Sequence, residues 1–248
     1  MPIDRLHALM HVFAALVVGG RCPGCRDRTL QPLCAACHAE LRAITPAPDA
    51  ALRDEGVAGR IARRAKHGHW RAGALALTPL LVERIGGTDW LRAHVDVATW
   101  IPADAGRRRR RGGHLPEQLA RGMARRSGIR AQPLLVRHRA RAQRGLDEHA
   151  RVRNVEGMFR LRARRGPTWA FGGRSGRVAP IRVLLLDDVR TTGATLAAAA
   201  AVLEQAGHRV VPYALVGVPR RDGARGQVYG ETRTVRGKPA HEGAADCR

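Results

Sequence analysis

Residues 183–195 read VLLLDDVRTTGAT, in which four apolar residues lead directly into two adjacent carboxylates, Asp187 and Asp188. A turn rich in threonine follows. An unbroken apolar run of this kind is typical of a central strand that is buried on both faces of a parallel sheet. Ligands of such sheets collect at the carboxyl ends of the strands. The stretch therefore predicts a buried strand that ends at a ligand-binding turn.

The groups in this turn suit a sugar phosphate. The turn consists of Thr191, Thr192, Gly193, Ala194 and Thr195. It precedes a predicted helix, whose free backbone N–H groups and dipole favour an anion. The threonine hydroxyls add donors, the glycine permits close backbone approach, and the two carboxylates can accept hydrogen bonds from sugar hydroxyls. We therefore expect a ribose 5-phosphate unit here.

A simpler interpretation is that Thr191 only caps the helix and that the two aspartates are solvated. This simpler interpretation accounts for only one of the three threonines in the turn. It leaves the adjacent carboxylates unexplained, because like charges side by side repel unless a ligand or cation uses them.

The surrounding sequence predicts an α/β fold. Residues 57–218 alternate helical patterns with apolar runs, which is typical of a largely parallel sheet flanked by helices. The predicted helices cover 57–85 (in two pieces broken near Gly68), 115–126 and 193–207, and the predicted strands cover 95–103, 132–138, 181–188 and 209–218. Residues 44–56 contain two prolines and a glycine and predict a linker. The polar residues 219–248 predict a disordered tail.

Residues 1–45 hold four of the five cysteines in a C-x₂-C-x₈-C-x₂-C pattern. The pattern consists of Cys22, Cys25, Cys34 and Cys37. Two close pairs in a cysteine-poor chain predict a tetrahedral Zn²⁺ site, and four thiolates leave no open position, so the zinc is expected to be structural. Disulfides are the alternative, which a reducing compartment disfavours. Cys247 is left over in the tail.

The N-terminus contains an apolar segment over residues 8–18, which is too short to cross a membrane. Arg5 is balanced by Asp4, and no A-x-A cleavage site follows, so a signal peptide is disfavoured. We expect an amphipathic helix here, no stable membrane insertion and a cytoplasmic location.

Positive charge dominates the chain, with a formal net charge of +23. Residues 107–165 alone hold 19 arginines against four acidic residues. A field of this sign attracts phosphates, whether on a metabolite, a nucleic acid or a membrane surface. The aromatic content of 4% disfavours base-stacking platforms.

The sequence LLLDDVRTTGAT resembles the phosphoribosyl pyrophosphate signature of type I phosphoribosyltransferases. The resemblance implies that Asp187 and Asp188 bind the ribose hydroxyls and that residues 191–195 bind the 5-phosphate. It also implies a second loop, after an earlier strand, that binds the pyrophosphate together with Mg²⁺. We expect Arg111 and Gly112 to belong to that loop, and the rest of the arginine run to be equally suited to nucleic acid.

Residues 137–159 resemble the ComF (competence protein FC-like) family, which joins an N-terminal zinc ribbon to a phosphoribosyltransferase domain. The matching residues are Arg139, Gln143, Leu146, Arg151, Asn154, Val155 and Phe159, and Lys66 and Gly68 match a further K-x-G element. The resemblance implies that this segment is the mobile loop that closes over the active site. The chain departs from the family after Gly112, where Gly113, His114 and Leu115 replace the usual Phe-Asn-Gln.

Two functions are expected from this resemblance. The first is a glycosyltransferase that moves the phosphoribosyl group of phosphoribosyl pyrophosphate to an acceptor that the sequence does not identify; no catalytic acid or base is evident. The second is a non-catalytic protein that binds single-stranded DNA and retains a sugar-phosphate site. ComF-like proteins are associated with DNA uptake, so the resemblance points to the competence DNA-uptake machinery as a partner.

Overall fold

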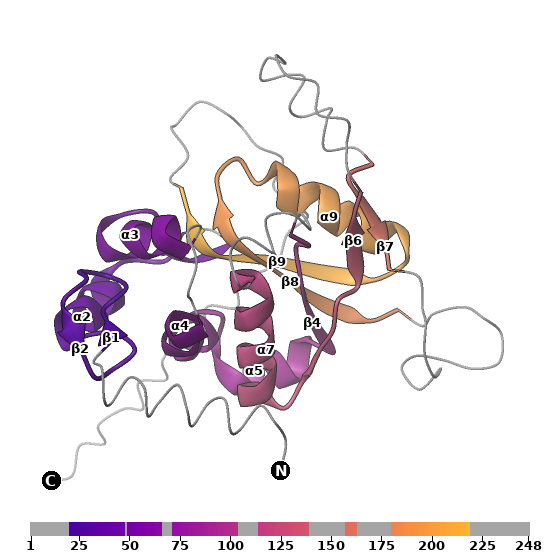
Figure 1. The fold of residues 1–248 in the computed structure, drawn as a ribbon. Helices are drawn as coiled ribbons and strands as arrows, with labels where there is room; N and C mark the ends of the chain where they lie inside the picture. Colours follow the sequence, from indigo (N-terminus) through magenta and orange to yellow (C-terminus); the bar gives the residue numbers. More distant parts are fainter. Residues whose placement is uncertain are drawn as a thin grey trace, which may run out of the picture.

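The computed structural model describes residues 20–47, 49–65, 71–103, 114–138, 157–162 and 180–218, apart from the side chains of 65 and 71–76. Within these residues, five parallel strands form one sheet in the order β3–β9–β8–β4–β5 (Figure 1). The strands are β3 (Ala50–Arg53), β4 (Val97–Trp100), β5 (Arg130–Ala131), β8 (Arg182–Arg190) and β9 (Arg209–Gly217). The predicted α/β fold with a parallel sheet flanked by helices is confirmed.

Strand β8 lies at the centre of the sheet, as its apolar run predicts. Residues 183–186 are fully buried. Leu184 and Leu186 pack into the cluster on one face of the sheet, and Val183 and Leu185 pack into the cluster on the other. Each buried leucine contributes roughly 1.5–3 kcal/mol relative to exposure, so this strand anchors both halves of the core.

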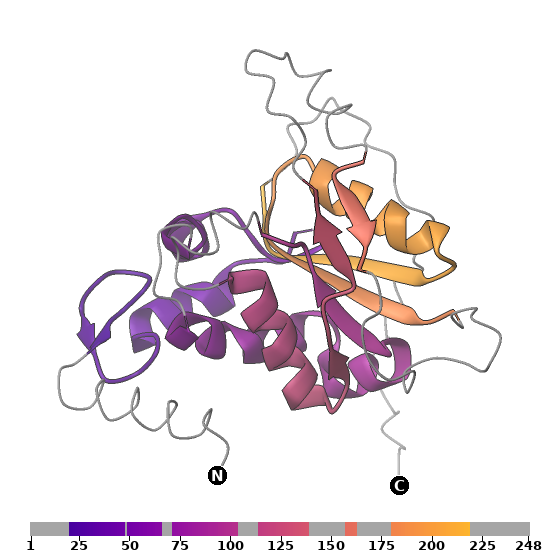
Figure 2. The same ribbon diagram turned by 45° about the vertical axis from the view of Figure 1, so that its right-hand side comes forward.

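Two helices cover opposite faces of the sheet (Figure 2). Helix α7 (Leu115–Ser127) packs Leu119 and Met123 into the cluster that contains Leu184. Helix α9 (Ala194–Gln205) packs Leu203 into the cluster that contains Leu185. Both helices were predicted, and Gly207, with φ of 86°, follows the end of α9 as expected.

The sheet reverses its winding direction between β4 and β8. From β4 the chain passes through α7 to β5 on one side, and from β8 it passes through α9 to β9 on the other. Helices α7 and α9 lie on opposite faces of the sheet, and parallel α/β sheets bind ligands where two such connections diverge. The carboxyl ends of β4 and β8 therefore meet at the topological switch point.

Three further helices lie in the described residues between 56 and 94. Helices α3 (Gly56–Ala65) and α4 (Arg71–Arg84) match the two predicted pieces of the helix over 57–85. Residues 66–70, with the predicted break near Gly68, lie outside the described residues. Helix α5 (Gly87–His94) was not predicted; it begins at Gly87, directly after Gly86, and both glycines have positive φ.

The linker prediction over 44–56 was wrong for residues 50–53. These residues form β3, which pairs with β9 from Ala50 opposite Ala214 to Arg53 opposite Gly217. Ala50, Ala51 and Leu52 are almost completely buried. The strand is only four residues long, and this shortness hid it among the surrounding turn residues.

The predicted strand over 132–138 is shorter and lies outside the parallel sheet. Strand β6 (Leu135–Arg137) pairs antiparallel with β7 (Phe159–Leu161) as a separate two-stranded sheet. Residues 138–158 connect the two strands of this hairpin in the sequence.

The N-terminal cysteines lie in a small unit made of β1 (Gly20–Arg21), β2 (Arg28–Thr29) and α2 (Ala35–Ala43). Strands β1 and β2 pair antiparallel. Cys22 and Leu41 belong to the same buried cluster as Ile61 of α3 and Leu186 of the sheet. The cysteine unit therefore shares one core with the α/β fold. The predicted N-terminal helix and the tail 219–248 lie outside the described residues.

Candidate functional site

The two aspartates lie within the carboxyl-terminal part of β8, which continues two residues further than predicted, to Arg190. Leu186 is opposite Trp100 of β4, and the Ile101 N–H donates to the Leu186 carbonyl at 2.9 Å. The chain therefore leaves β4 at the level of Asp187. Asp187 and Asp188, both half-buried, lie near the carboxyl end of β8 at the switch point.

Each aspartate folds its side chain onto the next backbone amide. The Asp187 Oδ1 accepts from the Asp188 N–H at 2.9 Å, and the Asp188 Oδ1 accepts from the Val189 N–H at 2.9 Å. Burial raises the pKa of Asp187 well above its usual range, and the neighbouring charge of Asp188 raises it further. The free pair is therefore electrostatically costly. Hydroxyl donors or a cation bound to these oxygens would relieve the cost.

The turn after β8 leads directly into α9. Gly193 is the N-cap residue with φ of 84°, a left-handed conformation that glycine adopts without strain. Among the described residues no side chain caps the helix; the Ala194 N–H donates to the Thr192 hydroxyl at 3.3 Å. Thr191 and Thr192 are exposed. The interpretation of Thr191 as a helix cap is therefore wrong.

The structure brings all five predicted turn residues to the end of β8, next to the aspartates. The residues are Thr191, Thr192, Gly193, Ala194 and Thr195. Hydroxyl groups and the amides of the first helical turn lie beside two carboxylates. This arrangement can bind a ligand that combines a polyol with an anion.

Arg137 lies near the candidate site and was not predicted from the sequence to belong to it. It ends β6, its guanidinium carbon lies 5.8 Å from the centre of the Phe159 ring, and its charge acts to lower the pKa of Asp187. Leu134, just before β6, donates its N–H to the Thr99 hydroxyl of β4 at 3.1 Å. The hairpin is thus attached to the sheet near the site. Nothing in the sequence distinguished Arg137 from the other arginines around it.

Several predicted site residues lie outside the described residues. They are Arg111 and Gly112 in the loop between β4 and α7, and Arg139, Gln143, Arg151 and Asn154 in the segment between β6 and β7. The first segment begins after β4 at the switch point, and the second begins and ends at the β6–β7 hairpin.

The four predicted cysteines form a cluster that can hold a metal ion. Their sulfur atoms all lie within 4.8 Å of one another, and the Cys25 and Cys34 sulfurs are 3.7 Å apart. A tetrahedral zinc site with Zn–S bonds of about 2.3 Å places its sulfurs about 3.8 Å apart. All four thiols are free, so the disulfide alternative is wrong. The prediction that these four cysteines come together in positions suited to a metal ion is confirmed.

Backbone amides prepare one of these thiols for metal binding. Burial acts to raise the pKa of Cys22, but hydrogen bonds from the Cys34, Cys25 and Gly24 amides outweigh it and bring the pKa to about 6. The Gly24 N–H lies 3.4 Å from the sulfur. Burial raises the pKa of Cys37, and the pKa of Cys25 is raised to about 11. A bound cation would favour the thiolate form of all four.

Helix α3 holds the first cysteine turn in place. Arg64 Nη1 donates to the Pro23 and Gly24 carbonyls at 2.6 and 2.7 Å, and Arg60 Nε donates to the Gly24 carbonyl at 3.1 Å. Glu40 of α2 accepts from the Val57 N–H at 2.7 Å. These contacts link the cysteine unit to the α/β fold through α3.

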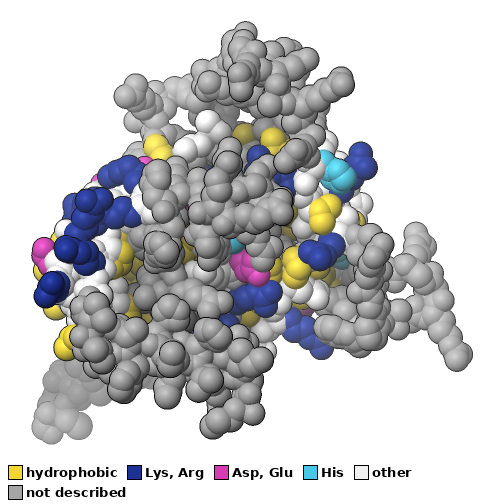
Figure 3. Space-filling view, in the orientation of Figure 1, with side chains coloured by type: hydrophobic (Ala, Val, Ile, Leu, Met, Phe, Trp, Pro, Cys, Tyr) yellow, Lys and Arg dark blue, Asp and Glu magenta, His cyan; other side chains and the backbone are white. Residues whose placement is uncertain are grey.

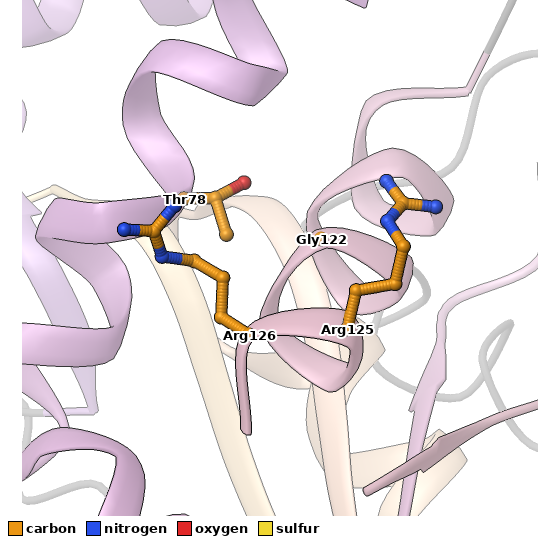
Figure 4. A pocket seen from close by; sticks show the side chains of 4 residues that line it. All are labelled: Thr78, Gly122, Arg125 and Arg126. Carbon is orange, nitrogen blue, oxygen red and sulfur yellow. The ribbon is translucent and has the colours of Figure 1, made fainter. Parts of the chain in front are cut away.

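A small cavity of about 190 Å³ lies between α4 and α7. It is lined by Thr78, Gly122, Arg125 and Arg126 (Figure 4). None of the predicted site residues that the structure describes lines this cavity.

No family model matches this chain, and no curated protein matches it. None of the described helices is both long enough and apolar enough to span a membrane.

Proposed function

We propose that the protein binds phosphoribosyl pyrophosphate with Mg²⁺ at the carboxyl end of β8 and transfers its phosphoribosyl group. The observation that carries this proposal is the position of Asp187 and Asp188 at the switch point, directly before the exposed turn that opens α9. Acceptors for two ribose hydroxyls and donors for a phosphate then lie on one continuous segment.

Under this proposal each part of the site has a separate role. The two carboxylates accept hydrogen bonds from the ribose hydroxyls, and the turn binds the 5-phosphate through its amides and hydroxyls. The loop that carries Arg111 and Gly112 binds the pyrophosphate, and the segment between β6 and β7 covers the ligand. Catalysis then rests on positioning and on stabilising the charge of the leaving group.

Carboxylate oxygens are ligands that Mg²⁺ accepts, so the donor set of this site fits the metal. When bound with the ligand, Mg²⁺ would neutralise negative charge on the phosphate oxygens.

For the cysteine cluster we propose structural Zn²⁺. Four thiolates satisfy a tetrahedral ion completely and leave no position for a substrate or water. The metal would then stabilise the cysteine unit and take no part in the reaction.

Isothermal titration of phosphoribosyl pyrophosphate with Mg²⁺ tests the main proposal. The wild type is compared with the Asp187→Asn/Asp188→Asn double variant, which keeps the shape of both side chains. We expect the variant to bind at least roughly 100-fold more weakly, because two charge-assisted hydrogen bonds are lost. Asp89→Asn is the control, since the Asp89 side chain is 93% exposed and far along the chain in α5. Equal binding by the double variant, or none by the wild type, would overturn the proposal.

A second proposed function is binding of single-stranded DNA, in the context of DNA uptake. It is favoured by basic side chains that gather over the part of the molecule occupied by α2 and α3 (Figure 3). Exposed arginines of the cysteine unit and of the adjoining β3 and α3 are Arg21, Arg26, Arg28, Arg42, Arg53 and Arg63. Such side chains bind the phosphate backbone without reading the sequence.

The salt dependence of single-stranded DNA binding tests this second function. Each neutralised phosphate contributes a slope of about −0.7 to the logarithmic plot. Arg26→Ala/Arg28→Ala is expected to reduce the slope, and a wild-type slope near zero would contradict the proposal.

A further inference from the structure

Arg190 is a buried arginine directly beneath the proposed phosphate turn. It is the last residue of β8 and immediately precedes Thr191, yet only 3% of it is exposed. Its side-chain Cγ and Cδ atoms lie 3.8 Å from the point that a Cβ on Gly193 would occupy. The stem of Arg190 therefore packs against the residue at which α9 begins.

The charge of Arg190 is poorly compensated. Its Nε lies 3.8 Å from Asp49 Oδ2, which is too far for a hydrogen bond. Among the described residues, neither its Nε nor its Nη1 has a hydrogen-bond partner. Its Nη2 lies 2.7 Å from the point that a Cβ on Gly217 would occupy, so the glycine in β9 makes room for the guanidinium.

A purely structural role does not account for this arrangement. An arginine stays charged in proteins, and burying a charge without partners costs several kcal/mol. An apolar side chain of similar volume would fill the same space at lower cost. Unsatisfied buried groups are rare and concentrate where a ligand uses them.

We propose that Arg190 is a positioning residue, whose charge beneath the turn strengthens the binding of the ligand's 5-phosphate. This inference rests on the proposed function and adds to it a residue outside the aspartate pair and the turn. Asp49 partly offsets the charge, so the two residues together set the affinity of the turn for an anion.

The test compares three variants by titration with phosphoribosyl pyrophosphate and Mg²⁺. Arg190→Met keeps the stem and removes the charge, and we expect about tenfold weaker binding or more. Arg190→Lys keeps the charge and should restore most of the affinity. Asp49→Asn removes the offsetting charge and should bind about two- to fivefold more tightly. Asp49 has φ of 55°, a conformation that asparagine also tolerates, so this variant should keep its backbone.

Urea unfolding of the same variants separates binding from folding. We expect Arg190→Met to be at least as stable as the wild type, because it removes an uncompensated buried charge. Equal ligand affinity in Arg190→Met would overturn this inference and leave the proposed function standing. If that variant fails to fold, unchanged or weaker binding by Asp49→Asn would overturn it. Absence of binding by the wild type would overturn both proposals.

Discussion

Arg182 and Asp96 form a bidentate ion pair that joins the amino ends of β4 and β8, the two strands at the switch point. Arg182 Nη2 lies 2.7 Å from Asp96 Oδ1, and Arg182 Nε lies 3.2 Å from Asp96 Oδ2. The Arg182 backbone N–H also donates to Asp96 Oδ2 at 2.8 Å. Arg182 begins β8, and Asp96 directly precedes β4. The pair therefore fixes the spacing of β4 and β8, whose opposite ends carry the site.

Asp96→Asn should destabilise the fold at neutral pH by about 1 kcal/mol, because both side chains are partly exposed and solvent weakens the pair. Hydrogen bonds from Arg182 lower the pKa of Asp96 below its usual value. The stabilisation is therefore present above the unfolded-state pKa, and it is lost as the pH falls through the lower folded-state pKa. Urea unfolding at pH 7 and near pH 2 measures both effects. A difference between wild type and variant that does not shrink in acid would contradict this prediction.

Asp187→Asn should have the opposite effect on stability. The folded-state pKa of Asp187 is raised by burial and by Asp188, so its contribution to stability is greatest below the unfolded-state pKa. That contribution is lost as the pH rises through the folded-state pKa. We expect the variant to be more stable than the wild type at pH 8, by about 0.5–2 kcal/mol, and to bind the proposed ligand more weakly. Thermal unfolding between pH 4 and pH 8 checks this, and a stability gap that narrows with rising pH would be inconsistent with it.

Removal of the metal should destabilise the whole described fold, because the cysteine unit and the sheet share one buried cluster. Cys22→Ser/Cys25→Ser should lose the metal and unfold in a single transition at lower temperature. Metal analysis and thermal unfolding followed by circular dichroism measure both. Cys247→Ser, which leaves the four clustered cysteines unchanged, is the matched control and should retain the metal. Wild-type metal content in the double variant would disprove the site.

The strongest sequence patterns predicted the core of the fold well. The predicted strand over 181–188 corresponds to β8 (Arg182–Arg190), and the predicted helix over 115–126 to α7 (Leu115–Ser127). Both have long periodic or continuous apolar patterns. Strands β3 and β5 have four and two residues, too few for a pattern, and they depend on pairing with strands far along the chain.

The residues of the candidate sites also differ in whether the sequence alone could predict them. The cysteine cluster was predictable because two short turns bring its four ligands together, within sixteen residues of chain. The influence of Arg137 was not predictable, because its charge reaches Asp187 only through the folding of β6 beside the sheet. Arg190 lies within residues 183–195, but its burial depends on Gly217 and Asp49, which are distant in sequence.

Gly24→Ala tests whether close packing at the first cysteine turn is needed for metal binding. A Cβ at this position would lie 2.5 Å from the Cys37 sulfur and 2.6 Å from a methyl group of Val57, so either the ligand or α3 must move. We expect a loss of about 1–3 kcal/mol in stability and weaker metal retention against a chelator. Gly20→Ala in the same unit is the control, because its Cβ would lie at an ordinary 3.6 Å from the Thr29 carbonyl oxygen. Chelator titration of both variants gives the comparison, and equal metal retention would show that the turn tolerates the added methyl group.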